Sequence, residues 1–171
     1  MATTVCVLDT CILIDLRHAG VLGKLALLSQ QFATTDLWQM DGMSSVSPND
    51  VGEAGIRVLQ AQPDLVARAL SLSLQNRTLS VADIFSLLLA EREHAMLVTG
   101  DRPLRRIAED RGIEVHGIIW LLHEMVRATA LSPTAAIAAL KRILSGGARL
   151  PLSAVDDQIA TWESYHGNEA S

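Results

Sequence analysis

The sequence predicts an α/β protein with three layers, in which helices flank both faces of a mainly parallel central sheet. Short runs rich in β-branched residues alternate with amphipathic helical stretches along most of the chain, which is typical of a parallel sheet. Aspartates follow two of these runs, at Asp9 and Asp101. Because strand C-termini share one edge of a parallel sheet and ligands gather there, this edge is where a functional site is expected.

The first half of the chain is expected to supply three strands. Residues 3–8 alternate in polarity, and the helix that follows has its apolar stripe at Ile12, Leu13 and Leu16. In chain order we expect a strand at 3–8, a helix starting at 10, a helix at 20–31, a strand at 32–35, a helix at 37–43, a loop at 43–55 with one helical turn at 50–54, a strand at 56–59 and a helix at 63–76.

The second half is organised around a helix, strand and helix between residues 79 and 112. Ser80 and Asp83 have the spacing of a capping box, which predicts a helix at 80–93. An apolar run at 95–99 predicts a strand, and Gly112 ends the next helix, which has Pro103 in its first turn. The remaining expected elements are a strand at 113–116 and helices at 118–130, 133–145 and 153–165.

Length and composition are those of one globular domain. A chain of 171 residues can bury one core and is short for two domains. Hydrophobic residues make up 49% of the chain and its mean hydropathy is +0.26, so a partner is expected to cover some apolar surface. The net charge of −5 argues against holding nucleic acid through a global positive field, although local binding is compatible with it.

The sequence also bears on location. No apolar run reaches the roughly 18 residues needed to span a bilayer, so no membrane association is expected. Residues 1–8 lack the pattern of a signal peptide. Cys6 and Cys11 lie too close together to frame a disulfide-bonded secreted fold. We therefore expect a cytoplasmic protein.

Four aspartates are expected at the carboxyl edge of the sheet. Asp9 and Asp101 follow strands, whereas Asp41 and Asp83 lie near the starts of helices. Each one alone is explained by helix capping. Together, without basic partners, they would repel one another unless a divalent cation neutralised them, and oxygen ligands favour Mg²⁺ or Mn²⁺ over Zn²⁺. Such an ion activates water for attack on a phosphodiester, which is nuclease chemistry.

Three segments carry a resemblance to a known family: VCVLDTCILIDL, LSVADIFSLLLAERE and AMLVTGDRPLRRIAEDRGIEVHGIIWLL. Together, over roughly residues 5–125, they resemble a PIN domain, the fold of the ribonuclease toxins of VapBC toxin-antitoxin operons. The resemblance implies an endoribonuclease that uses Mg²⁺ or Mn²⁺. It makes Asp9, Asp83 and Asp101 the metal ligands, and with Asp41 the catalytic set.

The resemblance also implies partners and a domain organisation. An RNA substrate, a cognate antitoxin protein and a homodimer are expected, and the high apolar content fits the homodimer. We expect the nuclease domain at residues 1–130 and a C-terminal helical extension at 131–171 that packs on the same domain.

The second acid departs from the family pattern, which has Glu followed by Leu on the helix after the second strand. Here Asp41 is followed by Gly42, and the alternative is Glu53 in NDVGEAG. Spacing from the preceding strand favours Asp41. The irregular acid and the negative net charge leave a second hypothesis open, in which the PIN fold is a catalytically weak or inactive binding or regulatory module.

Other polar residues flank the acids. Thr10 and Thr99 either orient carboxylates or are ordinary cap and strand residues. Arg102, Arg105 and Arg106 follow Asp101 and either hold phosphates or form a solvated helix face.

Overall fold

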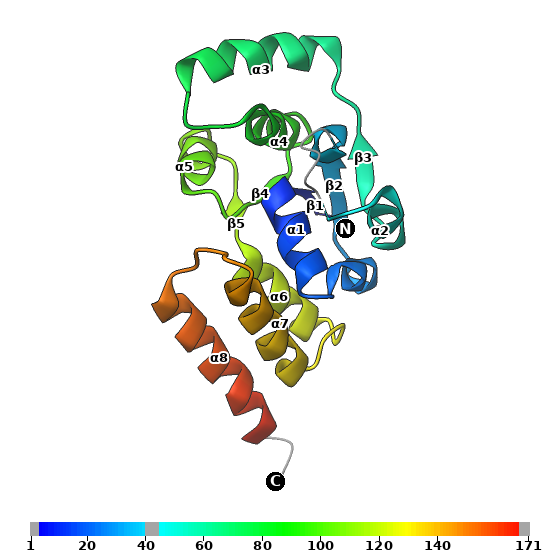
Figure 1. The fold of residues 1–171 in the computed structure, drawn as a ribbon, viewed down its shortest axis with the longest axis vertical. Coiled ribbons are helices and arrows are strands. Elements are labelled where there is room, and N and C mark those ends of the chain that lie inside the picture. Colours follow the sequence, from blue (N-terminus) through cyan, green and yellow to red (C-terminus); the bar gives the residue numbers. More distant parts are fainter. Residues whose placement is uncertain (1–3, 40–44, 168–171) are drawn as a thin grey trace.

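A computed structural model describes residues 4–39 and 45–167 of the chain. Within these residues five strands form one sheet in the order β3-β2-β1-β4-β5, and every neighbouring pair is parallel. The strands are β1 (Val5–Leu8), β2 (Gln31–Thr35), β3 (Arg57–Leu59), β4 (Met96–Val98) and β5 (Val115–His116). Helices lie on both faces of this sheet (Figure 1), so the predicted fold class is confirmed.

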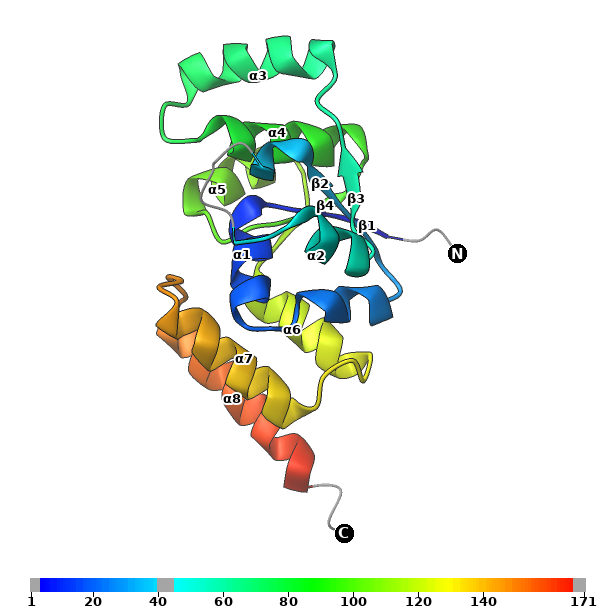
Figure 2. The ribbon, with the colours of Figure 1, turned by 45° about the vertical axis from the view of Figure 1, so that its right-hand side comes forward.

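The helices divide into two groups that bury opposite faces of the sheet. On one face lie α4 (Val81–Arg92) and α5 (Arg102–Asp110), and α3 (Pro63–Gln75) packs on the outside of α4 (Figure 2). On the other face lie α1 (Thr10–His18), α6 (Ile118–Arg127) and α7 (Pro133–Ser145), and α8 (Leu152–Gly167) packs against α7. Successive residues of β1 alternate between these cores, because side chains of a strand point to opposite faces.

The last two helices belong to the core of the same molecule. Trp162 of α8 and Leu140 of α7 are fully buried, in one apolar cluster with Leu8 of β1 and Val98 of β4. The division of the chain at residue 130 stays a prediction. No helix in the described part of the chain is long and apolar enough to cross a membrane.

Two predicted helices differ from the structure. Residues 20–31 do not form an α-helix; a 3₁₀ helix, η1, spans Leu22–Leu27 instead. Only Leu22 and Leu25 of η1 are buried, and a spacing of three residues matches the period of a 3₁₀ helix. Of the helix predicted at 37–43, only residues 37–39 are described, and they belong to a second 3₁₀ turn, η2 (Asp36–Gln39); Asp41 lies outside the described residues.

The segment expected to be a loop with one helical turn holds a longer helix, α2 (Pro48–Glu53). Ser47 caps it, because its hydroxyl accepts from the Asp50 amide at 3.2 Å while the Asp50 carboxylate accepts from the Ser47 amide at 2.8 Å. Pro48 occupies the first turn, where its missing N–H costs nothing. These local signals extend the helix.

Candidate functional site

Asp9 is the most buried carboxylate of the candidate site. It follows β1 directly and caps α1, and only 2% of its surface is exposed. Its Oδ1 accepts from the Thr10 amide at 2.8 Å. Its Oδ2 accepts from the Thr99 hydroxyl at 2.8 Å and from the Cys11 thiol at 3.2 Å. Three donors therefore hold this side chain in place.

Asp101 is connected to Asp9 through one threonine. Thr99, directly after β4, is fully buried, and its hydroxyl accepts from the Asp101 amide at 3.0 Å while it donates to Asp9. Asp101 caps α5, since its Oδ1 accepts from the Leu104 amide at 2.7 Å. Thr99 thus fixes both aspartates relative to the ends of neighbouring parallel strands.

Asp83 stands in the first turn of α4. The predicted capping box is present: the Ser80 amide donates to Asp83 Oδ2 at 2.7 Å, and the Asp83 amide donates to the Ser80 hydroxyl at 3.1 Å. The three carboxylates therefore lie at the N-termini of three helices, where the helix dipoles favour negative charge.

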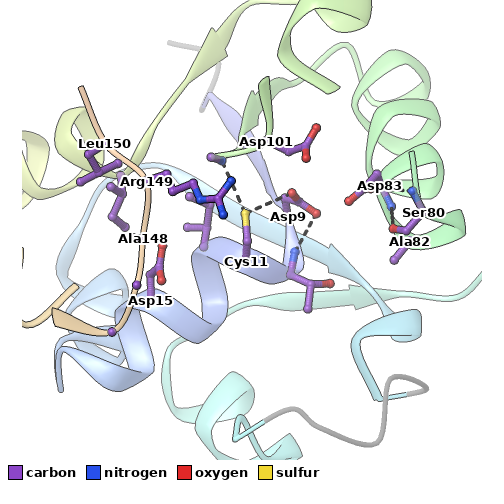
Figure 3. A pocket seen from close by; sticks show the side chains of 16 residues that line it. Asp9, Cys11, Asp15, Ser80, Ala82, Asp83, Asp101, Ala148, Arg149 and Leu150 are labelled. Carbon is purple, nitrogen blue, oxygen red and sulfur yellow. Dashed lines mark hydrogen bonds between the residues drawn. The ribbon is translucent and has the colours of Figure 1, made fainter. Parts of the chain in front are cut away.

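A pocket of about 370 Å³ collects these side chains and is called the carboxylate pocket below. Asp9, Asp83 and Asp101 line it together with Asp15 from the second turn of α1 (Figure 3). The linker between α7 and α8 (146–151) borders the pocket, and Arg149 of this linker extends its side chain toward Cys11. Segments far apart in the sequence thus meet at the carboxyl edge of the sheet.

Burial and charge raise several pKa values in this pocket. Burial and the neighbouring Asp83 carboxylate raise the pKa of Asp9, although hydrogen bonds from Thr99, Cys11 and Thr10 act in the opposite direction. Burial and the Asp9 carboxylate hold the pKa of the Cys11 thiol well above its usual range, so this thiol stays protonated and donates to Asp9. Burial raises the pKa of Asp15 to about 6.

The donor set suits a hard divalent cation. The acidic side chains that line the pocket offer carboxylate oxygens, and the protonated Cys11 lacks the thiolate that would favour zinc. Within residues 4–39 and 45–167, however, no three Asp, Glu, His or Cys side chains are grouped closely enough to hold a metal ion as they stand.

The two candidates for the second acid have different outcomes. Asp41 lies outside the described residues. Glu53 is exposed at the end of α2, where it accepts from the Asn49 side chain at 2.9 Å. It borders a separate hollow with Arg17 and is absent from the lining of the carboxylate pocket.

Two charged residues of the pocket were not expected from the sequence. Asp15 follows Asp9 by six residues, on a helix whose sequence pattern shows only its buried stripe of Ile12, Leu13 and Leu16. Arg149 lies in a short linker without any motif. Its place in the pocket depends on how α7 and α8 pack, which local sequence does not reveal.

Two solved structures and one family model are similar to this chain. One solved structure similar to the chain is a PilT N-terminus domain protein, SSO1118, from the hyperthermophilic archaeon Sulfolobus solfataricus, with a TM-score of 0.51 and 14% identity over 72% of this chain and 94% of that one. Another is PAE2754 from Pyrobaculum aerophilum, with a TM-score of 0.47 and 20% identity over 75% of this chain and 91% of that one. No curated protein matches the chain in sequence. The family model described as PIN domain matches residues 5–164, nearly the whole chain, and this protein is therefore a member of the PIN domain family.

Proposed function

We propose that this PIN domain protein is a Mg²⁺- or Mn²⁺-dependent endoribonuclease of the VapC toxin type. Members of the family are generally nucleases. The observation that carries the proposal is the shared pocket of Asp9, Asp83 and Asp101, which are up to 92 positions apart in the sequence and come from three helix N-termini. A buried carboxylate beside a second one needs a cation to remain charged at low cost.

The residues of the chain divide the work as follows. Asp9, Asp83 and Asp101 are the proposed metal ligands, and Asp41 is the proposed fourth acid. Thr99 holds Asp9 and positions the Asp101 backbone through its single hydroxyl. The Cys11 thiol keeps its proton and donates a hydrogen bond to the Asp9 carboxylate, which orients that carboxylate. A bound divalent cation would supply an activated water and charge stabilisation for attack on the phosphodiester.

A cleavage assay tests the proposal. The purified protein with Mg²⁺ or Mn²⁺ is expected to cut single-stranded RNA. Asp9→Asn and Asp101→Asn are expected to lower the rate at least about a hundredfold, since each removes a charge that acts on the reaction. The matched control is Asp157→Asn on the exposed surface of α8. Equal cutting by all variants, with unchanged melting curves, rejects the assignment.

A catalytically weak or inactive binding module is the second candidate. It is favoured by the lack of a ready three-ligand group among the described side chains and by the net charge of −5. Titration calorimetry with Mn²⁺ separates the two proposals. A saturable heat that Asp9→Asn abolishes supports the nuclease, whereas no heat above background supports the binding module.

The toxin assignment brings proposed partners. A cognate antitoxin would cover the carboxylate pocket. A homodimer would use α3, where Val66, Leu70 and Leu74 form an exposed stripe with relative residue exposures of 38, 57 and 77%. Five apolar residues of α6, by contrast, are buried within the chain: Ile118, Leu121, Leu122, Met125 and Val126. Light scattering of the protein and of Leu70→Glu tests the dimer.

The reduced Cys6 and Cys11 fit the proposed cytoplasmic location.

A further inference from the structure

A second pocket adjoins the carboxylate pocket. It has a volume of about 520 Å³ and lies between the starts of α5 and α6 and the α7–α8 linker. Gly100, Ile118, Arg149 and Leu150 line both pockets and form their common wall. A ligand long enough to pass this wall would occupy both pockets at once. We call the second one the arginine pocket.

The two pockets carry opposite charge. Arg102, Arg105 and Arg149 line the arginine pocket, and none of its described lining residues is acidic. The carboxylate pocket has four aspartates, and Arg149 is the one basic residue among its described lining. A strand of nucleic acid that is cut at the aspartates would therefore meet positive charge as soon as it leaves them.

The three arginines differ in how many contacts their guanidinium groups already make within the protein. Arg105 donates to the Val115 carbonyl at 3.2 Å and to the Thr99 carbonyl at 3.5 Å, and it lies 3.6 Å from Glu109. These contacts fix its guanidinium at the ends of β4 and β5. Arg102 and Arg149 form no ion pair with any residue that the structure describes, so their charges are available to a ligand.

The remaining wall of the arginine pocket is apolar and partly aromatic. Ile119, Trp120 and Pro151 line it. The Trp120 indole stacks on the His116 ring, with ring centroids 4.1 Å apart and planes inclined by 16°, which limits its rotation. A flat, half-buried aromatic beside two available guanidinium groups matches the two parts of a nucleotide: a base that packs and a phosphate that pairs.

We infer that the arginine pocket is a nucleotide subsite, which holds the phosphate next to the one cleaved and packs the adjacent base against Trp120. This inference rests on the proposed nuclease function for the identity of the strand as RNA. Arg102 and Arg149 would bind the phosphate and Arg105 would hold the local backbone in place. The subsite would make the substrate a strand that continues past the cleaved bond, so a single nucleotide would be bound poorly.

Binding in the presence of EDTA tests the subsite apart from catalysis. The probe is a fluorescein-labelled single-stranded RNA of roughly 12 nucleotides, followed by anisotropy at several KCl concentrations. Arg149→Gln and Arg102→Gln are expected to weaken binding by about three- to tenfold each. Each is also expected to reduce the slope of log affinity against log salt by about 0.7, the value for one phosphate contact to a single strand.

Arg127→Gln is the matched control, because Arg127 is exposed at the end of α6, pairs with Glu124 at 2.8 Å and lines neither pocket. If Arg102→Gln and Arg149→Gln bind RNA with the affinity and salt slope of the wild type, the inference is overturned. It is also overturned if the wild type binds no RNA. A cleavage assay adds a second readout. Arg149→Gln should raise KM and leave kcat nearly unchanged, since a neighbouring phosphate is held equally before and during reaction. A lower kcat at constant KM contradicts the subsite.

The two proposals fail in different ways. RNA binding that depends on Arg102 and Arg149, together with no cleavage in Mg²⁺ or Mn²⁺, retains the subsite and rejects the nuclease. Cleavage that depends on Asp9, with arginine variants that bind and cut like the wild type, retains the nuclease and rejects the subsite. Melting curves of every variant show whether a loss reflects unfolding instead.

Discussion

Replacing Asp15 by Asn is expected to stabilise the metal-free protein at neutral pH. Asp15 lies in the second turn of α1 at the edge of the carboxylate pocket, where burial raises its pKa from 3.8 to about 6 and the nearby His18 opposes that rise. The folded chain therefore prefers the protonated side chain. Stability from this preference is complete below pH 3.8 and is lost as the pH rises through about 6. Asn has nearly the same shape and never ionises.

The magnitude follows from the two pKa values. At 1.36 kcal/mol for each pKa unit, the difference between about 6 and 3.8 corresponds to about 3 kcal/mol at pH 7.5. Solvent reaches part of the side chain and screens its charge, so we expect about 1–2 kcal/mol. For a chain of 171 residues each kcal/mol shifts Tm by about 2–4 °C, which gives a rise of roughly 2–8 °C.

The assay is thermal unfolding in EDTA at several pH values between 4 and 8, because EDTA removes any cation that would offset the charge. The gain from Asp15→Asn should be largest above pH 7 and shrink steadily below pH 6. Asp157→Asn, an exposed aspartate of α8, serves as the control and should melt like the wild type at every pH. Equal Tm values at pH 7.5, or a gain that does not change with pH, would refute the reasoning.

Three further predictions concern the supports of the site and the core. Ser80→Ala removes half of the capping box of α4 and should cost about 1 kcal/mol, measured by urea unfolding with Ser132→Ala as a comparable cap loss. Thr99→Val removes a hydrogen bond that lowers the pKa of Asp9, so the acid limb of the pH-rate profile should move to higher pH; an unchanged profile contradicts this role for Thr99. Leu140→Ala should cost about 2–5 kcal/mol and lower a single cooperative Tm, whereas a separate early transition would show that α7 and α8 unfold on their own.

The sheet was predictable because its strands are short apolar runs bounded by turn residues. The spacing of Ser80 and Asp83 likewise predicted the start of α4, since both hydrogen bonds of the capping box form between residues three positions apart. The strand predicted at 95–99 before Gly100 is present as β4, one residue shorter at each end (Met96–Val98). These features depend on contacts within a few residues, which a sequence displays directly.

The prediction of an α-helix at 20–31 was wrong because the spacing of its leucines fits both an α-helix and a 3₁₀ helix. Leu22 and Leu25 are three positions apart, which fits one face of an α-helix or of a 3₁₀ helix. Gly20, with φ at +74°, ends the preceding turn, and no side chain caps the next one. An α-helix without a cap and with a narrow buried stripe gains too little to form there.

The composition of the candidate site was predictable only in part. Asp9 and Asp101 follow strands, so the parallel sheet itself brings them to one edge. Asp15 and Arg149 reach the same pocket through the packing of α7 on α1, a contact between segments more than a hundred positions apart. No local pattern encodes such a contact.

The position of the α7–α8 linker in the sequence determines when the carboxylate pocket becomes complete during translation. Asp9, Asp83 and Asp101 are all translated before Arg149, which follows them by 48 residues or more. A ribosome-bound chain that has reached α6 therefore has every described acid of the pocket but none of its bordering linker. If the proposed binding of RNA needs that linker, a chain that stops before residue 146 would bind the strand poorly although it carries every described acid of the pocket.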